Sequence, residues 1–433
     1  MQKVLLITYY WPPSGGAGVQ RWLKLTKYLG MHGVKPYVLT VDEAHASYMQ
    51  EDHSLLQDVG EDVKVYKTKS FEPINYYAKL VGKDKVPTAG FSNVDNTKWS
   101  QKMVNAIRSN LFVPDPRRGW NHYAYKKAVE IITKEQIEVV ITTSPPHSTQ
   151  LLGLKLQKKL NIKWIADLRD PWTDIYYYEL LGHSFFSKKL DAYWEKQVVK
   201  HADKIITVSQ SLKNIFFTKD NSIDEAKIYI VPNGFDPEDF EGSEKKPHHG
   251  FVIGYTGTMS DKYNPLPFFD SLQTIVKQFD NIDIKLQIVG RISKAIQQYI
   301  SNLDVEFELI NTVPHSQIVQ YQKDADLLLL VIPDIPSADS ILTGKLFEYI
   351  ATGNKIIGIG PAQSEVADIL EKCELGQMFD RNNREGMATY IENIIHAYLQ
   401  NKKNKANRVE IEKYSRAYQA QHIRDIICEL LNT

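Results

Sequence analysis

Short apolar runs alternate with longer segments of helical periodicity along most of the chain. The first run, residues 3–8, is continuous and apolar, as expected for a strand that is buried on both faces of a parallel sheet. Residues 19–29 then place apolar side chains at helical spacing. The alternation predicts further strands at 36–41, 63–66, 139–142, 164–167, 205–208 and 228–231, and helices at 123–134, 147–160, 184–201 and 211–217. This order predicts a doubly wound α/β domain.

A polar stretch with two prolines interrupts this alternation at residues 236–250. Apolar runs then return at 251–255, 285–289, 306–309, 327–332 and 355–358, and amphipathic helices follow at 387–399 and 408–431. The pattern predicts two doubly wound domains and a final helix, with these bounds: 1–235, a linker at 236–250, 251–405, and 406–433. Open sheets of this kind bind ligands beyond the carboxyl ends of their strands. If these ends face each other, the site is a cleft between the domains, so the loops that follow strands hold the candidate residues.

The composition narrows the class of protein. The 433-residue chain has 43% hydrophobic and 24% charged residues, as in an ordinary globular protein. Its longest buried-looking run, 327–332, is far shorter than the roughly 18 residues that a membrane helix needs. The apolar run at the N-terminus is also short, which is typical of a first strand rather than of a signal peptide. Two cysteines are too few for a disulfide scaffold or a cysteine-rich zinc site. These features predict a cytoplasmic protein.

Charge is distributed unevenly, although the net charge is zero. Residues 1–200 hold 28 Lys and Arg against 20 Asp and Glu, whereas residues 201–433 hold 24 against 32. Within the basic half, residues 79–118 mix lysines and arginines with aromatic residues. Such a segment favours an anionic membrane or a phosphorylated substrate, and the lack of a dense basic run argues against nucleic acid. Ordinary surface variation, or an aromatic core under a long loop, is the alternative.

The strand-following loops of the first domain carry three groups with candidate chemistry. Gly16 lies in a glycine-rich loop before a helix, where free amides bind anions. A dinucleotide fingerprint is a weak alternative, because an arginine replaces its third glycine, and a plain glycine turn is another. His147 opens the helix after the strand at 139–142, as a ligand contact or as a solvated first-turn residue. Asp167, Arg169 and Asp170 end the next strand, where they pair with one another or hold hydroxyls and phosphates of a ligand.

The strand ends of the second domain offer candidate donor-binding residues. Gly257 and Thr258 follow its first strand and provide amides and a hydroxyl. Lys262, four residues further on, and Arg291, after the next strand, are candidate phosphate cations. Each signal is weak alone, and their repeated placement after strands is what favours a site.

The most specific segment is Thr343-Gly344-Lys345, which predicts a helix start after the strand at 327–332. The amides and the dipole of a helix start hold phosphate. Glu348 lies in the first turns of the same helix, where its carboxylate can accept both hydroxyls of a ribose. The alternative is a glutamate that only balances the helix dipole. The segment is not a Walker loop, because no Ser or Thr follows the Gly-Lys pair.

Sequence signals for a metal site are weak. The D-x-D spacing at 324–326 matches a metal–nucleotide motif, but it leads directly into an apolar strand and is more typical of a helix–strand junction. The sequence has no H-E-x-x-H, no Cys/His cluster and no G-x-S-x-G, which disfavours zinc protease and α/β-hydrolase chemistry. We therefore predict no metal and no cofactor.

Taken together, these motifs resemble those of GT-B fold glycosyltransferases of the retaining family 4 type, from bacterial polysaccharide pathways. The resemblance covers nearly the whole chain and rests on PPSGGAG near the N-terminus, SPPH at 144–147, DLRDPW at 167–172, VPNGFD at 231–236, GYTGT at 254–258 and TGKLFEYIATGNKIIGIG at 343–360. It implies two Rossmann-like domains facing across a cleft, with a nucleoside diphosphate sugar held mainly by the second and an acceptor by the first. It also implies a last helix that returns to the first domain.

The resemblance implies individual roles, with two departures. Gly16 corresponds to the glycine loop near donor and acceptor, and Glu348 to the ribose-binding second glutamate of an E-x7-E motif. Ser340 replaces the first glutamate of that motif. Arg169 replaces the histidine that usually precedes Asp170 near the reacting sugar. The Lys and Arg that hold the donor diphosphate match the two cations named above only loosely.

These observations predict an enzyme that transfers a sugar from a nucleoside diphosphate sugar to a hydroxyl of a glycan or lipid-linked acceptor, with retention. A helix start and cations would stabilise the charge that grows on the leaving diphosphate, without a metal. The expected place of action is the cytoplasm or the inner-membrane surface. The alternatives are a nucleotide-sugar epimerase or dehydrogenase, and a non-catalytic nucleotide-binding module.

Overall fold

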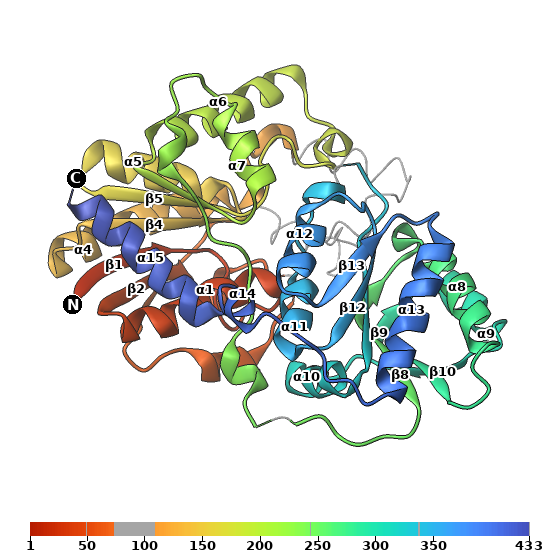
Figure 1. Ribbon diagram of the computed structural model, residues 1–433. Helices are drawn as coiled ribbons and strands as arrows, with labels where there is room; N and C mark the ends of the chain where they lie inside the picture. Colours follow the sequence, from red (N-terminus) through yellow and green to blue (C-terminus); the bar gives the residue numbers. More distant parts are fainter. Residues whose placement is uncertain (49, 73–108, 243, 337, 433) are drawn as a thin grey trace. The chain divides into compact units, whose positions relative to one another are not determined.

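The computed structural model describes residues 1–48, 50–72, 109–242, 244–336 and 338–432. It divides into two compact units (Figure 1). Unit 1 consists of Met1–Pro232 together with Gln419–Thr433, and unit 2 consists of Asn233–Tyr418. Each unit contains one parallel sheet with helices, which confirms the predicted fold class of two doubly wound α/β sheets.

Unit 1 is built on a parallel sheet whose described strands lie in the order β3-β2-β1-β4-β5-β6-β7. These strands are β1 Gln2–Ile7, β2 Val34–Val41, β3 Lys64–Thr68, β4 Val139–Ser144, β5 Lys163–Leu168, β6 Lys204–Thr207 and β7 Ile228–Ile230. Each contains or overlaps an apolar run of the sequence. The chain reverses its direction of winding between β1 and β4, which therefore flank the topological switch point.

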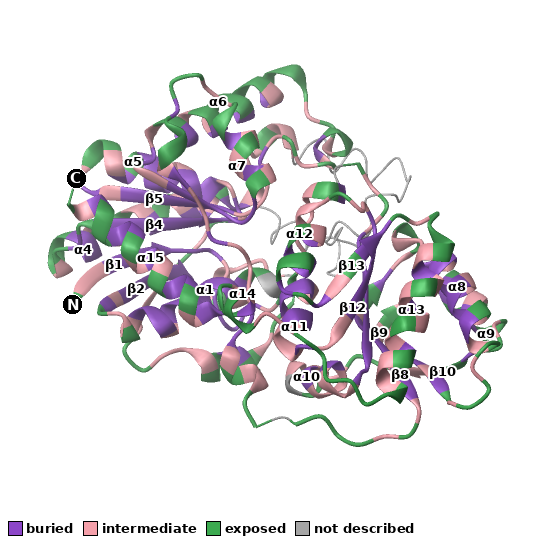
Figure 2. Ribbon diagram, viewed as in Figure 1, coloured by how far each residue is buried: buried purple, intermediate pink, exposed green. Residues whose placement is uncertain are grey.

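The helices of unit 1 follow the predicted periodicity, and buried residues cover both the strands and the helix faces that pack on them (Figure 2). The helices are α1 Ala17–Met31, α4 Asn121–Glu135, α5 Ser148–Lys159, α6 Phe185–His201, α7 Gln210–Phe217 and most of α15 Arg416–Leu431. Shorter 3-10 turns are η1 Glu43–His45, η2 His53–Asp58, η5 Pro116–Trp120, η6 Tyr178–Leu181 and η7 Glu225–Lys227. Trp120 and Trp164 fill the centre of this core.

Unit 2 has the strand order β10-β9-β8-β11-β12-β13 in its described part. The strands are β8 Phe251–Met259, β9 Ile284–Ile292, β10 Glu306–Ile310, β11 Leu327–Val331, β12 Lys355–Ile359 and β13 Gly376–Phe379. Helices and turns are η8 Pro237–Phe240, η9 Asp261–Tyr263, α8 Leu266–Val276, α9 Lys294–Ser301, α10 His315–Asp324, η10 Ala338–Ser340, α11 Gly344–Thr352, α12 Glu365–Lys372, α13 Arg384–Leu399 and α14 Arg408–Glu412.

Strand β11 shows why this sheet needs helices on both faces. Leu327 and Leu329 belong to a core shared with α8 and α13, whereas Leu328 and Leu330 belong to a second core shared with α11 and α12. Successive strand residues point to opposite faces, so an uninterrupted apolar run is buried on both.

Strands β8 and β9 extend beyond the runs that predicted them. The two chains stay paired to Met259 and Ile292, with Gly257 opposite Gly290. Gly290 has φ +136°, and a Cβ there would lie 2.2 Å from the carbonyl oxygen of Gly257. Gly257 and Thr258 therefore lie within β8, and the prediction that they form a loop after this strand is wrong.

The last predicted helix is two helices. α14 ends at Glu412, and Ser415 then pairs with Phe235 before α15 begins at Arg416. Residues Gln419–Thr433 belong to unit 1. Among the described residues, no helix is both long enough and apolar enough to cross a membrane.

Candidate active site

In unit 1, the loops after β1, β4 and β5 meet at one edge of the sheet because these three strands are neighbours. Gly16, His147 and the Asp167–Asp170 segment lie in or next to these loops. The sheet topology therefore brings together the residues that the sequence named separately.

Asp167 is the buried anchor of this edge. Its side chain is 0% exposed and accepts hydrogen bonds from Trp22 Nε1 at 2.6 Å and Thr143 Oγ1 at 2.7 Å. Arg21 NH2 lies 3.3 Å from its other oxygen, in an ion pair that is also fully buried. Because protein donors occupy both oxygens, Asp167 positions the loop and has no free oxygen for a substrate.

Arg21, which sequence reasoning treated only as a lost glycine, is part of this anchor. It lies in α1 and donates to the carbonyl oxygens of Val231 and Pro232, both at 2.8 Å. Burial lowers the pKa of Arg21, and the charge of Asp167 opposes that shift. Arg21 therefore ties the end of β7 to the centre of the sheet.

Arg169 holds the glycine loop. Its Nε donates to the Ser144 carbonyl oxygen at 2.9 Å and its NH1 to the Gly18 carbonyl oxygen at 3.0 Å. Gly16 precedes α1 with φ +96°, a conformation that favours glycine. Arg169 thus joins the start of α1 to the end of β4, and its side chain, which is only 9% exposed, also lies 3.9 Å from Asp167.

Asp170 differs from Asp167, three residues earlier. It is half-buried, and none of the described residues donates a hydrogen bond to its carboxylate. Burial raises the pKa of Asp170, the positive charge of Arg169 opposes the shift, and Asp167 adds to it. A carboxylate with free lone pairs and a raised pKa can accept a hydrogen bond or a proton from a ligand hydroxyl.

His147 is held flat against Trp172. The two rings stack with centroids 4.7 Å apart and planes 13° apart. Burial, with the nearby charge of Arg169, lowers the pKa of His147 to about 3, so the imidazole is neutral at physiological pH. Its Nδ1 is buried without a hydrogen-bond partner among the described residues. Trp172 is fixed in turn by Asp191, which accepts from its Nε1 at 2.7 Å.

In unit 2, the predicted helix start is confirmed. α11 begins at Gly344, with Thr343 as its N-cap residue. The Thr343 side chain does not accept the usual capping hydrogen bond, and its Oγ1 is buried with no partner in the described part of the chain. The amides of this first turn follow the loop after β11, at the carboxyl edge of the sheet.

Lys345 lies beside this helix start in a partly buried position. Its Nζ donates to Tyr255 Oη at 2.5 Å and lies 4.4 Å and 5.5 Å from the ring centres of Tyr255 and Tyr263. Burial lowers the pKa of Lys345 to about 8. A Cβ on Gly257 would lie 3.3 Å from Nζ, so the glycine leaves room for the lysine.

Glu348 lies one turn further along α11. One of its oxygens, Oε2, accepts from Gln322 Nε2 at 2.7 Å, and the same nitrogen lies 3.0 Å from Thr256 Oγ1. Tyr349 accepts from the Thr256 amide at 2.9 Å. Glu348 is thus oriented by one protein donor, and the second carboxylate oxygen has no described donor. Gln322, on α10, gave no signal in the sequence.

The other predicted donor contacts are less well placed. Thr258, Lys262 and Arg291 are exposed, and among the described residues no contact joins the side chains of Thr258 and Arg291 to Lys345 or Glu348. The backbone of Lys262 does reach this edge, because its carbonyl oxygen accepts from the Asp334 amide at 2.7 Å. The structure thus gathers the helix start, Lys345, Glu348 and Gly257, and leaves the three remaining side chains as surface groups.

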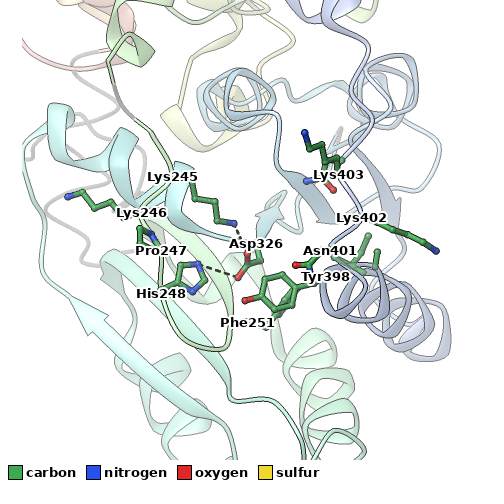
Figure 3. Close-up of a pocket in the computed structure, with 13 residues that line it drawn as sticks. Lys245, Lys246, Pro247, His248, Phe251, Asp326, Tyr398, Asn401, Lys402 and Lys403 are labelled. Carbon is green, nitrogen blue, oxygen red and sulfur yellow. Dashed lines mark hydrogen bonds and ion pairs between the residues drawn. The ribbon is translucent and has the colours of Figure 1, made fainter.

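The D-x-D segment lies at the opposite edge of this sheet, before β11. Figure 3 shows Lys245 and His248 directed at Asp326, at 2.5 Å and 3.5 Å. The second oxygen of Asp326 accepts from the Val252 amide at 2.8 Å, and Asp324 accepts from the Lys246 amide at 2.8 Å. These carboxylates hold the segment before β8 in place. The D-x-D spacing therefore belongs to a helix–strand junction, as the second interpretation of the sequence predicted.

Part of the chain is similar to a known protein family, and the whole chain resembles solved structures. Residues 86–239 match the model of Glycosyltransferase Family 4. The solved structure of HepE (Alr3699) from Anabaena in complex with UDP superposes on 99% of this chain and 100% of its own, with a TM-score of 0.61 and 12% identity. Residues 86–239 are thus similar to Glycosyltransferase Family 4, and the two parallel sheets have the GT-B fold.

Two further solved structures resemble the chain. A variant of TarM from S. aureus, solved with Fondaparinux, alpha-GlcNAc-glycerol and UDP, matches 100% of both chains with a TM-score of 0.57 and 12% identity. A putative UDP-N-acetylglucosamine 2-epimerase from Listeria monocytogenes covers 98% of this chain and 95% of its own, with a TM-score of 0.52 and 12% identity. No curated protein sequence matches the chain.

Ser340 is the point where this chain departs most from the resemblance. It ends η10, and Thr343, the residue before α11, follows three residues later. A serine there offers a hydroxyl in place of a carboxylate, so it cannot supply the negative charge of the expected first glutamate.

Proposed function

We propose that the protein is a glycosyltransferase that moves a sugar from a nucleoside diphosphate sugar to a hydroxyl acceptor in polysaccharide or glycolipid assembly, with retention. The observation that carries this proposal is the group formed by the α11 start, Lys345 and Glu348 at the carboxyl edge of the second sheet. The family match and the UDP complexes of the HepE and TarM relatives support it.

The donor would be recognised by parts of unit 2 with distinct chemistry. The amides of Gly344 and Lys345 at the helix start suit the diphosphate, and the Lys345 ammonium adds a charge. The free oxygen of Glu348 suits the ribose hydroxyls, since its other oxygen is held by Gln322. These groups stabilise the charge that develops on the leaving diphosphate.

Unit 1 would supply the acceptor-side chemistry. Asp170 has lone pairs that no described donor occupies, and it suits a hydroxyl of the sugar or of the acceptor. The neutral ring of His147 offers a further polar atom, held in place by Trp172. Arg169 fixes the backbone around them and takes the place of the expected histidine.

A binding and turnover assay tests this proposal. A thermal-shift screen with UDP, GDP, ADP, TDP and their sugars should identify one base that stabilises the protein. With that donor, Asp170→Asn should abolish most turnover and keep the nucleotide affinity of the parent. Equal turnover in the two proteins would remove Asp170 from the reaction.

An epimerase is the second candidate, because one structural relative is described as a putative epimerase. Product analysis separates the two functions: an epimerase converts the donor alone, whereas a transferase needs an acceptor and releases nucleoside diphosphate. Tight nucleotide binding without any turnover would favour the non-catalytic module, for which Ser340 and Arg169 are the sequence arguments.

Metal independence is part of the proposal. The α11 start and Lys345 provide positive potential where the diphosphate would lie, so turnover should continue in EDTA. Loss of turnover in EDTA with recovery on Mg²⁺ or Mn²⁺ would contradict this assignment.

The basic segment at residues 79–118, proposed for membrane contact, lies mostly outside the described residues. In its described part, Arg117 is buried in unit 1 and donates to the Ser47 carbonyl oxygen at 3.0 Å. Trp120, just beyond the segment, is also buried, as the alternative of an aromatic core expects.

A further inference from the structure

An apolar surface covers the start of α6 and the loop before it. Phe186 is 81% exposed and Phe185 64%. Along the helix, residues 186, 190 and 193 lie on one face, because they are four and three residues apart. The full set of exposed apolar side chains, here called the α6 surface, is Tyr176, Leu180, Phe185, Phe186, Leu190 and Tyr193.

The opposite face of α6 already has its partners. Asp191 is buried and accepts hydrogen bonds from Trp172 and from Tyr178 Oη at 2.8 Å. Glu195 is buried with Lys219 Nζ at 2.8 Å. The helix is therefore fixed by its inner face, and the exposed aromatic residues are not needed to attach it to unit 1.

The two faces of α6 also differ in charge. Both carboxylates of α6 are on the buried face, whereas its lysines are at the periphery. Lys188 pairs with Glu179 and Lys196 with Asp220, and Lys189 lies 4.5 Å from the ring of Phe185. Lys189 and Lys200 have no carboxylate partner among the described residues. The exposed side of α6 is thus apolar at its centre with lysines at its edges, and the exposed acid beside it, Glu179 of the preceding loop, is paired with Lys188.

We propose that the α6 surface docks on an anionic membrane, with the aromatic side chains among the lipid headgroups and acyl chains and the lysines on lipid phosphates. Exposed aromatic side chains suit the headgroup region of a membrane, and lysines beside them are attracted to anionic lipids. A second copy of the chain fits less well, because a two-fold contact through this face would bring the lysines of both helices together. The inference extends the proposed function, since a lipid-linked acceptor would be met at such a surface.

Co-sedimentation of the full-length protein with vesicles tests the docking. The protein should pellet with phosphatidylcholine vesicles that contain 30% phosphatidylglycerol at low salt, and should be released at high salt. Vesicles of phosphatidylcholine alone should retain several-fold less. Absence of binding to the anionic vesicles at low salt would overturn the proposal.

Variants then locate the surface. The double changes Phe185→Ser with Phe186→Ser, and Lys188→Glu with Lys189→Glu, should each reduce the bound fraction at least about tenfold. The matched controls are Val409→Ser, which removes another exposed apolar side chain, and Lys402→Glu with Lys403→Glu, which changes equal charge in unit 2. Both controls should bind like the parent. Binding that survives the two α6 variants, or that is lost equally in the controls, would contradict the assignment.

Two measurements distinguish membrane docking from self-association through the same surface. Hydrogen exchange of the parent with anionic vesicles should show protection at 185–193. Light scattering without vesicles should give the same mass in solution for the parent and for the Phe185/Phe186 variant. A dimer that dissociates in the Phe variant would assign the surface to a second copy and overturn membrane docking. Nucleotide affinity should be unchanged in all variants, so a failure of docking is distinguishable from a failure of the proposed function.

Discussion

Asp167 in unit 1 and Glu348 in unit 2 are both carboxylates near the carboxyl edge of a parallel sheet, but they have opposite surroundings. Asp167 is fully buried, and protein donors occupy both its oxygens. Glu348 is half-buried, and the donor from Gln322 reaches only one of its oxygens. A satisfied buried carboxylate holds the protein together, whereas a half-satisfied one is available to a ligand.

The nearby cations repeat this contrast. Arg21 is buried, and its two terminal nitrogens donate to Asp167 and to two carbonyl oxygens. Lys345 has one hydroxyl partner and a lowered pKa. Both sites lie at places that sequence patterns mark as functional. A side chain whose hydrogen-bonding atoms all have protein partners supports the structure, whereas one with unused atoms can bind a ligand. The number of these partners therefore distinguishes the two roles better than the position of the residue in a motif.

The largest expected effect is on stability in unit 1. Asp167→Ala leaves the Arg21 guanidinium buried without its counter-charge, and this should lower the free energy of unfolding by about 3–5 kcal/mol. Urea denaturation measures the loss, with Asp167→Asn as the control that keeps one acceptor and should lose less. An unfolding free energy equal to that of the parent would show that Asp167 is not the anchor.

Glu348→Gln should produce the reverse result. The free energy of unfolding should change little, because only the Gln322 contact depends on this side chain. Nucleotide affinity should fall by about 1–3 kcal/mol, the scale of hydrogen bonds to a charged group. Calorimetry measures it, and Glu371→Gln, on an exposed part of α12, is the matched control. Unchanged affinity would show that Glu348 does not touch the ribose.

The pH dependence of binding should sharpen the role of Lys345. Its pKa is about 8 in the folded protein, so the ammonium loses its proton as the pH rises through that value. Nucleotide affinity should then fall by up to about tenfold per pH unit, because the phosphate prefers the charged lysine. Lys345→Met should remove this slope, and a slope that persists in the variant would assign it to another group.

The stability of the ligand-free protein should change in the opposite direction. Between pH 8 and the unfolded lysine pKa of roughly 10.4, the unfolded chain binds more protons at this residue than the folded one. Its contribution to the free energy of unfolding therefore rises with pH in that window.

The smallest expected effect concerns Arg169. In Arg169→Lys, one ammonium replaces a guanidinium that reaches both Ser144 and Gly18, so one hydrogen bond is lost. The free energy of unfolding should fall by about 1 kcal/mol. Turnover measured on the same sample shows whether Arg169 supports the structure or contacts a ligand. A large loss of turnover at nearly constant stability would make Arg169 a ligand contact, like Glu348.

Much of the fold was predictable from local pattern. The run at 327–332 corresponds to β11, and the Thr-Gly-Lys segment marks the start of α11, because apolar runs and helix starts are encoded by neighbouring residues. The extension of β8 past Gly257 was not predictable. It depends on the cross-strand approach of Gly290, which lies 33 positions away in the chain.

In the candidate site, too, local sequence predicted some residues and long-range contacts determined others. Glu348 was found because its helix start lies a few residues before it. The burial of Arg21 depends on Asp167, which is 146 residues away, and Gln322 meets Glu348 from a different helix. Sequence spacing alone contains no record of such distant partners, so it named Asp167 as a candidate catalytic group and missed both Arg21 and Gln322.

The division of unit 1 into Met1–Pro232 and Gln419–Thr433 has a consequence for biosynthesis. The closing segment buries Ile423 and Ile427, and Glu429 pairs with Lys204 and Tyr229 on the last two strands of the sheet. A ribosome adds about 5–20 residues per second, so unit 1 waits roughly 10–40 s for its last helix while unit 2 is translated. During that interval the nascent chain exposes the apolar residues that Ile423 and Ile427 later cover, and chaperones bind exposed apolar surface of this kind.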